Sequence, residues 1–516
     1  MRCYRKSLFI LCFFASTTCV TAQNSKDNVI LSAIRGADSK PDTIWLAMGK
    51  GKTQVTNVRL KNDDQESFQL VFTQLTSQKN GLVIVKFKPP LDFIGITYAK
   101  LYLDNAKGET IKEINLTGLS TKALEGENEP PLSLILKALG YNINLGWKEL
   151  SNHIKPQLEG DELPPSLFQK VGKGNIEIFP VARYSPDFEL PFGYYTNQSG
   201  ALTKHQVGIL SKSGKHPEHQ TLFPAVVSGT TSFDPGNNAF GFYTTSPSHT
   251  GFSEDIWNIV TSPTHAIRAA RVYPVRDKNN KLLENIYIFG FEEARNGDYN
   301  DYIFLIKNVR PVNPEEFVAL FNGRNFDGWT KFIHDTGKDI DTVGNFRIEN
   351  GMLHVIGKEV GYVITKNSYT NYHLRVDFKW GEKKWPPREN AMRDAGICYH
   401  VPLNETDKIW PRTIECQIQE GDTGDFWLIC NSTIEVDGKP NLPGDYTLIA
   451  KKKDAEKPFG EWNTVEVISY NGRCIHMVNG EIVNYGANAN LKTGRILLQS
   501  EYAEVYYKDI KIKQLQ

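Results

Sequence analysis

The chain has 516 residues, which is long enough for three domains of ordinary size. Lys and Arg number 59 and Asp and Glu also number 59, so the composition predicts no strongly basic surface and argues against nucleic acid as a partner. Aromatic residues make up 11% of the chain. They suit β-sandwich cores first and sugar-stacking surfaces second.

The first 22 residues have the pattern of a signal peptide. Arg2, Arg5 and Lys6 form a positive start, Leu8–Ala15 is a short apolar run, and small residues lead to a cleavage site after Ala22. The apolar run is too short for a permanent membrane-spanning helix, and no later segment is apolar enough to be one. We therefore expect an exported protein with no transmembrane span.

Cysteines outside this leader fall only in the last third of the chain, at Cys398, Cys416, Cys430 and Cys474. Their spacing matches neither a zinc site nor a redox motif. Two interpretations stay open, buried free thiols or a pair of disulfides in an oxidising compartment. Cys19, in the leader, offers a less favoured lipid-anchoring alternative to cleavage after Ala22.

Short strands separated by turn residues are predicted near the start of the chain. They cover Gln54–Leu60, Ser67–Gln74, Leu82–Phe87 and Ala99–Leu103, and the region closes on Ile114–Leu119. Residues 28–122 resemble the small immunoglobulin-like modules of exported bacterial proteins. The resemblance implies an immunoglobulin-like β-sandwich.

A second β-rich domain is expected over residues 130–312, after a polar linker. Its first element is a short helix over Leu132–Leu139, and near its end two predicted strands flank an acidic loop with Asp298, Asn300 and Asp301. Such hard oxygen ligands suit Ca²⁺, whereas the simpler alternative is a turn in which Asp and Asn bond the backbone. The loop resembles that of an exported bacterial domain with an FE…NGGDNDYNDxVF signature.

The last domain, residues 315–516, has a series of landmarks in fixed order. They are Phe321–Trp329, Phe346–Leu353, Glu461–Val467, Val478–Glu481, Gly494–Glu501 and Val505–Ile512. In this order they resemble the 3-keto-disaccharide hydrolase domain family. The resemblance implies a concanavalin-like jelly roll, so the whole chain is predicted to be all-β and multidomain.

Strict alternation supports such a sheet. Over Thr413–Gln419, alternation turns Ile414, Cys416 and Ile418 to the core and their neighbours Glu415, Gln417 and Gln419 to the other face. A polar face is usually just solvated, but Glu and Gln are poor strand formers. Gly396–His400 is expected to pair with this strand, which would bring His400 near Glu415; the alternative is a surface histidine.

The resemblance also implies a reaction, cleavage of a 3-keto-glycoside by elimination and hydration. It implies an acid–base pair from Glu415 and His400, with Gln417 and either Lys379 or Arg412 stabilising an enolate. A divalent metal held by His400, Glu415 and Asp422 is a further possibility. The remaining residues predicted to contact substrate are Arg393, Asp394, Gln419, Glu420, Asp422 and Trp427.

At two positions the chain departs from the family pattern. Asp394-Ala395-Gly396 stands where Asn-Ser-Gly is usual, and Glu420 stands where Asp is common. A retaining glycosidase on this fold would need a second carboxylate on the strand where Gln417 lies, so direct two-carboxylate hydrolysis is disfavoured.

Two functional hypotheses follow. In the first, the protein is a carbohydrate-active hydrolase in the periplasm or at the surface of a bacterium, supplied with keto sugars by a separate oxidoreductase, because the chain has no dinucleotide-binding pattern. In the second, it is a carbohydrate-binding or scaffold protein without turnover.

Overall fold

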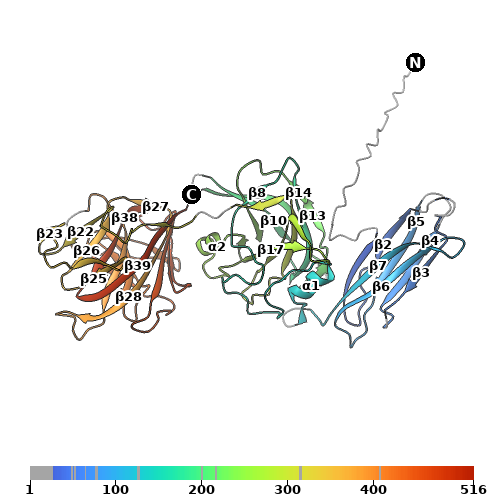
Figure 1. Cartoon of the computed structure of the whole chain (residues 1–516), viewed down its shortest axis with the longest axis horizontal. Coiled ribbons are helices and arrows are strands. Elements are labelled where there is room, and N and C mark those ends of the chain that lie inside the picture. The colour runs from blue at the N-terminus through green and yellow to red at the C-terminus, as the bar shows by residue number, and fades with distance from the viewer. Residues whose placement is uncertain are drawn as a thin grey trace, which may run out of the picture.

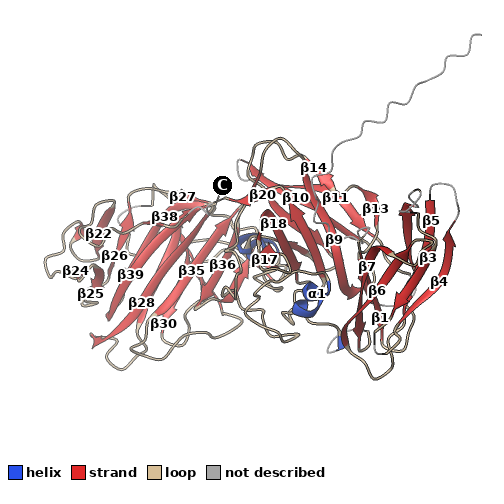
Figure 2. Cartoon of the chain, turned by 45° about the vertical axis from the view of Figure 1, so that its right-hand side comes forward, coloured by secondary structure: helices blue, strands red, loops and turns tan. Residues whose placement is uncertain are grey.

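The computed structural model describes residues 27–47, 50, 54–63, 65–75, 80–124, 128–198, 201–214, 218–312, 316–405 and 408–515. The predicted signal peptide lies outside these residues. Figure 1 shows three β-rich bodies in chain order along the long axis of the molecule. Strands dominate all three, as Figure 2 shows, and the prediction of an all-β, multidomain chain is confirmed. No helix in the described part of the chain is long and apolar enough to cross a membrane.

The first body is a sandwich of two sheets, with strand orders β1-β7-β6-β3 and β2-β5-β4. Inward-facing side chains such as Val83, Val85 and Leu101 are buried between the sheets because apolar residues alternate along each strand. Its strands are β1 Asn28–Ile34, β2 Asp42–Ala47, β3 Asn57–Lys61, β4 Phe68–Leu75, β5 Asn80–Phe87, β6 Gly95–Asp104 and β7 Thr110–Thr121.

The second body begins with helix α1, Leu132–Ala138, which ends before Gly140 at a positive φ of 84°. Its two main sheets have the orders β13-β11-β10-β15-β16 and β12-β9-β19-β18-β17. The other elements are α2 Asp255–Thr261 and β8 Phe168–Lys170, β9 Ile176–Pro186, β10 Leu190–Gln198, β11 Ala201–Leu210, β12 Glu218–Leu222, β13 Val226–Gly229, β14 Ser232–Phe233, β15 Gly241–Thr245, β16 Thr250–Phe252, β17 Ala270–Arg276, β18 Leu282–Phe291, β19 Tyr302–Lys307 and β20 Val309–Pro311.

The third body is a larger sandwich. One sheet has the order β24-β25-β39-β28-β35-β36-β37, and the other has the order β23-β22-β26-β38-β29-β30-β31-β34. Its strands are β21 Val318–Ala319, β22 Trp329–Ile333, β23 Gly337–Lys338, β24 Phe346–Glu349, β25 Met352–Val355, β26 Gly361–Thr365, β27 Tyr369–Thr370, β28 Tyr372–Lys384, β29 Asp394–Val401, β30 Thr413–Gln419, β31 Phe426–Ile429, β32 Glu435–Val436, β33 Lys439–Pro440, β34 Tyr446–Ile449, β35 Asn463–Tyr470, β36 Arg473–Val478, β37 Glu481–Gly486, β38 Thr493–Ser500 and β39 Ala503–Gln514.

Alternation places the core of this third body as predicted. Val376 and Phe378 of β28 meet Ile414, Cys416 and Ile418 of β30 between the two sheets. Burying side chains of this size stabilises the fold by about 1.5–3 kcal/mol each. The four cysteines of the body, Cys398, Cys416, Cys430 and Cys474, are free thiols, which favours the first of the two cysteine interpretations.

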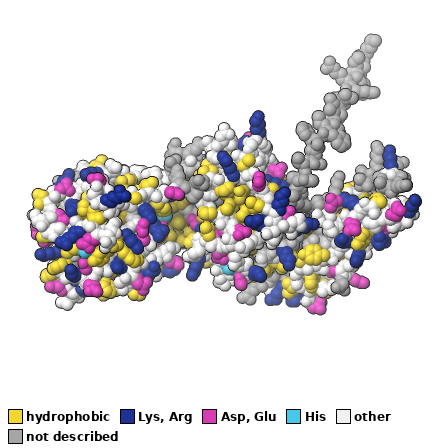
Figure 3. Space-filling model, viewed as in Figure 1, with side chains coloured by type: hydrophobic (Ala, Val, Ile, Leu, Met, Phe, Trp, Pro, Cys, Tyr) yellow, Lys and Arg dark blue, Asp and Glu magenta, His cyan; other side chains and the backbone are white. Residues whose placement is uncertain are grey.

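The second and third bodies share a hydrophobic core. Trp257 of α2 packs against Tyr470 of β35, with ring centroids 5.1 Å apart, and Ile259, Ile475 and Met477 belong to the same cluster. On the face of the molecule in Figure 3, basic and acidic side chains are interspersed, in keeping with the balanced composition.

Candidate active site

The candidate site lies on the face of the second sheet of the third body that points away from the core. Its centre is the pairing of β29 with β30, where Cys398 lies opposite Glu415 and Gly396 opposite Gln417. On the other side of β29, Cys398 pairs with Leu497 of β38, so Gln499 follows on the same face. Because paired residues point to the same side of a sheet, these polar side chains converge.

Gly396 leaves the space in which Glu415 lies. A Cβ atom at residue 396 would overlap both Oε1 of Glu415 and Oε1 of Gln499. The side chain of Glu415 is 4% exposed and that of Gln499 is 2% exposed, so both are packed into this gap. A glycine at the centre of three strands therefore positions a carboxyl group over the sheet.

Arg388 closes one side of the site. It forms an ion pair with Asp394 at the start of β29, and its Nη2 donates a hydrogen bond of 2.8 Å to Oε2 of Glu501, which follows β38. We call the whole group the carboxylate site; it consists of Arg388, Asp394, Glu415, Gln417, Gln499 and Glu501.

The three carboxyl groups hold their protons more tightly than usual. Burial, followed by repulsion from Asp394, raises the pKa of Glu501 to about 7. Burial also raises the pKa of Asp394, although Arg388 opposes the shift. The pKa of Glu415 lies well above its ordinary range because of burial and the neighbouring Glu501 and Asp394. The site thus contains carboxyl groups suited to donating and accepting protons near neutral pH.

Two buried amide oxygens at the site have no partner. Oε1 of Gln417 and Oε1 of Gln499 accept no hydrogen bond from any described residue. The amide nitrogen of Gln499 contacts Sγ of Cys398 at 3.4 Å. Unpaired buried acceptors are costly, and hydroxyl groups of a bound molecule would satisfy these two.

Several other residues predicted from the sequence lie around this site. Trp427 of β31 pairs with Glu415 and is half-buried on the same face. Gln419 lies opposite Asp394, and its Nε2 donates a hydrogen bond of 2.7 Å to Asp422 in the following turn. The prediction of a polar face with an aromatic side chain beside it matches this geometry.

A second ion pair borders the site. Nη1 of Arg393 lies 2.7 Å from Oε1 of Glu420, and its guanidinium group covers the ring of Phe459 at 4.2 Å. These contacts fix both residues at the rim, where their charges compensate each other. Arg412 directly precedes β30, and its charge lies near the carboxylate of Glu405.

The expected pairing of His400 with Glu415 is wrong. His400 has a positive φ of 60°, and the register against β38 shifts between Cys398 and Val401. This bulge turns His400 inward to the opposite sheet, where its Nε2 lies 2.9 Å from Oγ of Ser469. Burial lowers its pKa to about 4. A metal site made by His400, Glu415 and Asp422 is excluded for the same reason.

Lys379 is also separated from the site. It belongs to β28 in the other sheet, and its neighbours Phe378 and Trp380 fill the core. Lys379 therefore points away from the sandwich, where its Nζ lies 5.3 Å from the ring of Trp462. The predicted contact between Lys379 and an enolate at Glu415 is contradicted, because the whole core lies between them.

Sequence reasoning missed Arg388, Gln499 and Glu501 as site residues. For two of them a signal exists, because alternation along β38 places Gln499 and Glu501 on the face of Leu497. Arg388 comes from the loop between β28 and β29, and no periodic pattern predicts how such a loop folds over a sheet.

The predicted cation ligands lie in the second body, in the loop between β18 and β19. Asp298 and Asp301 come together there with Glu292, and each offers an oxygen within 4.8 Å of the others. Asn300, the third predicted ligand, is buried beside them and donates from Nδ2 to the carbonyl oxygen of Pro130.

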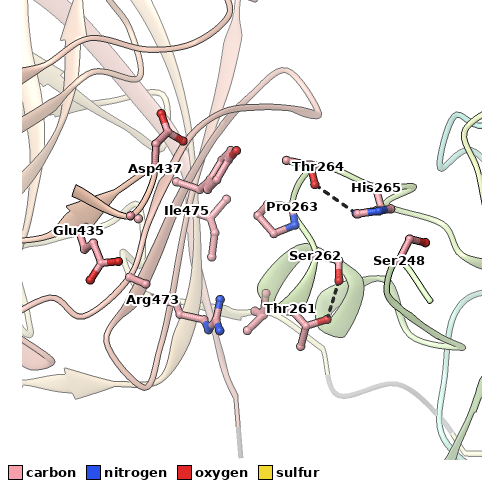
Figure 4. Close-up of a pocket in the computed structure, with 15 residues that line it drawn as sticks. Ser248, Thr261, Ser262, Pro263, Thr264, His265, Glu435, Asp437, Arg473 and Ile475 are labelled. Carbon is pink, nitrogen blue, oxygen red and sulfur yellow. Dashed lines mark hydrogen bonds between the residues drawn. The ribbon is translucent and has the colours of Figure 1, made fainter. Parts of the chain in front are cut away.

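A separate pocket of about 350 Å³ lies between the second and third bodies. Figure 4 shows Pro263, Thr264 and His265 on one side of it, facing Arg473 and Asp437 on the other. None of the carboxylate-site residues lines it. We therefore place the candidate chemistry at the carboxylate site.

Residues 316–513 match the family model described as the 3-keto-alpha-glucoside-1,2-lyase-like domain. This match contains the whole carboxylate site. A 3-keto-disaccharide hydrolase from Bacteroides thetaiotaomicron is 23% identical over 190 residues, which cover 34% of this chain and 59% of the relative. The chain thus spans less than two thirds of that curated relative.

Solved structures also resemble part of the chain. A proposed glycosyl hydrolase from Parabacteroides distasonis is 21% identical and covers 39% of this chain and 94% of its own, with a TM-score of 0.28. A carbohydrate-binding module from Bacillus subtilis is 10% identical, covers 39% of this chain and all of its own, and also has a TM-score of 0.28. A β-glucanase from Bacillus licheniformis is 12% identical over 39% and 98% of the two chains, with a TM-score of 0.26.

Proposed function

We propose that the third body cleaves glycosidic bonds of 3-keto-glycosides by elimination followed by addition of water. The proposal rests on one observation: two buried carboxyl groups, Asp394 and Glu415, and the partly buried Glu501, all with raised pKa values, converge with two unpaired amide oxygens on one face of a lyase-like domain. The names of the matching family and relative supply the substrate class.

The carbonyl group at carbon 3 of such a sugar acidifies the hydrogen on carbon 2. A carboxylate base removes this proton, the electron pair forms the double bond between carbons 1 and 2, and the bond from carbon 1 to the glycosidic oxygen breaks. The departing oxygen takes a proton from a carboxylic acid. Water then adds at carbon 1 and returns a proton to carbon 2, which gives the free keto sugar.

The environment of each carboxyl group suggests its role. Glu415 is the least exposed of the three carboxyl groups, and burial together with Glu501 and Asp394 raises its pKa, so we assign it the protonation of the leaving oxygen. Asp394 and Glu501 share the cation of Arg388, which favours their charged forms and so suits them to act as the base. The amides of Gln417 and Gln499 would bind sugar hydroxyl groups and the developing enolate.

Trp427 supplies a surface for a sugar ring. It pairs with Glu415 on β31, and its other neighbour, Leu448 of β34, is 49% exposed. An apolar surface next to a general acid would bind one face of a sugar ring. The polar groups of the carboxylate site would then form hydrogen bonds with its hydroxyl groups.

The leader and the first two bodies have supporting roles in the proposed function. We infer export from the leader, with the first two bodies acting as spacer or docking units. A separate oxidoreductase would have to oxidise carbon 3, because this chain has no nucleotide-binding glycine pattern to carry out that step.

The test is release of the aglycone from 3-keto-glucosides of several linkages, with and without EDTA. We expect release by the unsubstituted protein and a loss of about 10²-fold or more in kcat for Glu415→Gln. Glu481→Gln is the matched control, since Glu481 is exposed and forms a surface ion pair with Lys453. Binding of the keto-glucosides without any release would favour the carbohydrate-binding alternative instead.

A further inference from the structure

A cluster of carboxylates lies far from the proposed chemistry, in the loop that joins β18 to β19 of the second body. Glu292, Asp298 and Asp301 each place a carboxylate oxygen within 4.8 Å of the other two. Their exposed fractions are 2%, 1% and 7%, so solvent does little to reduce their mutual repulsion.

The hydrogen bonds to these carboxylates come from neutral groups. The backbone amides of Ala294 and Asp298 donate to Glu292, and that of Glu293 donates to Asp301. Nδ2 of Asn296 donates to Asp298 at 2.6 Å. Among the described residues, no Lys or Arg side chain forms an ion pair with any of the three.

Arg183 is the basic residue whose charge reaches Asp301, but its donors are used elsewhere. It donates to Oγ of Ser185 and to the carbonyl oxygens of Phe188, Pro186 and Ser211. All four acceptors are neutral. No cationic side chain among the described residues therefore makes a direct hydrogen bond to the cluster.

Asn300 is a second, independent observation that points to a ligand. Its side chain is wholly buried, and Nδ2 donates a hydrogen bond of 3.1 Å to the carbonyl oxygen of Pro130. That bond fixes the orientation of the amide, because a carbonyl oxygen only accepts. Oδ1 of Asn300 is consequently a buried acceptor without a partner among the described residues, in the same turn as the two aspartates.

We propose that Glu292, Asp298 and Asp301 bind one Ca²⁺ ion, with Oδ1 of Asn300 as a further oxygen ligand. Carboxylate and amide oxygens are the ligands that Ca²⁺ prefers, and Ca²⁺ tolerates irregular ligand geometry better than Mg²⁺ does. Asp301 also lines a cavity of about 750 Å³, so one of the proposed ligands borders open space.

Binding there would hold together a junction of the chain. The loop accepts hydrogen bonds from the backbone of Asn152 and His153 at the carbonyl oxygens of Asn296 and Gly297. Asn300 connects the same loop to Pro130, just before α1, where the first body ends and the second begins. The ion would thus stabilise the connection between the first two bodies.

The experiment is a calorimetric titration of the full, metal-free chain with CaCl₂, together with thermal unfolding in Ca²⁺ and in EDTA. We expect one bound ion per chain, weaker binding of Mg²⁺, and a rise of about 2–4 °C in Tm that EDTA reverses. Asp298→Asn should abolish both the heat of binding and the Ca²⁺-dependent rise.

Two comparisons keep the result decisive. Glu284→Gln removes an exposed carboxylate from the same strand, β18, and should leave binding unchanged. Asp298→Asn relieves repulsion in the metal-free chain, so its Tm in EDTA should equal or exceed that of the unsubstituted protein. No binding at millimolar Ca²⁺, or equal binding by Asp298→Asn, would overturn the proposal.

Discussion

Arg388 sets the charge state of the two carboxyl groups that border the candidate site. Without its cation, Asp394 and Glu501 would repel each other with less compensation, and their pKa values would rise further. If this pair supplies the base, kcat/KM should rise with pH through an inflection near the Glu501 pKa of about 7. Arg388→Met should move the inflection to higher pH, as measured in a pH–rate profile.

The direction of this shift separates two roles for Arg388. A merely structural role would lower the rate equally at every pH, and Arg388→Lys, which keeps the charge, would then be no better than Arg388→Met. A partial return of the inflection toward 7 in Arg388→Lys is expected if charge is what matters. An inflection that moves to lower pH contradicts the proposed base.

Gly396 has no side chain, and the space this leaves determines where Glu415 lies in the candidate site. In Gly396→Ala the nearest atoms to the new methyl group would be the ends of two side chains, those of Glu415 and Gln499. We expect a change in unfolding free energy of about 1 kcal/mol or less, but a loss of about 10²-fold in kcat, because Glu415 is displaced. Urea unfolding and aglycone release measure the two effects; a large loss of stability would contradict this account.

The strands β28, β29 and β30 are elements that the sequence predicts well, and they also show where prediction fails. Alternation correctly places Ile414, Cys416 and Ile418 in the core and Glu415 on the other face, since a strand has a period of two. His400 breaks the rule because it is the extra residue of a bulge and, like Tyr399 before it, faces the opposite sheet. No periodic pattern of apolar and polar residues in the sequence predicts such a bulge.

Pairing between strands distant in sequence is equally hard to predict. The pairing of β38 with β29 brings Gln499 beside Gly396, over a separation of about a hundred residues, and only the closed sheet makes them neighbours. Lys379 illustrates the reverse case, in which a correctly predicted strand lies in the other sheet. Element type follows from local pattern, whereas sheet membership follows from packing of the whole domain.

At the scale of the whole molecule, the core shared by the second and third bodies couples their stability. Trp257 carries much of this contact, and its Nε1 also donates a 3.0 Å hydrogen bond to Glu254. Trp257→Ala should cost about 3–5 kcal/mol through the cavity it leaves. We expect the two bodies to unfold in one calorimetric transition in the unsubstituted protein and in two separate transitions in the variant.

Trp45→Ala is the matched control for this experiment, because Trp45 lies on β2 of the first body and is 66% exposed. It should leave the joint transition unchanged. Two transitions already present in the unsubstituted protein would show that the shared core is too weak to couple the bodies. One transition in both proteins would mean that contacts outside the Trp257 cluster suffice. If separation occurs as expected, the carboxylate site should keep its activity, since all of its residues belong to the third body.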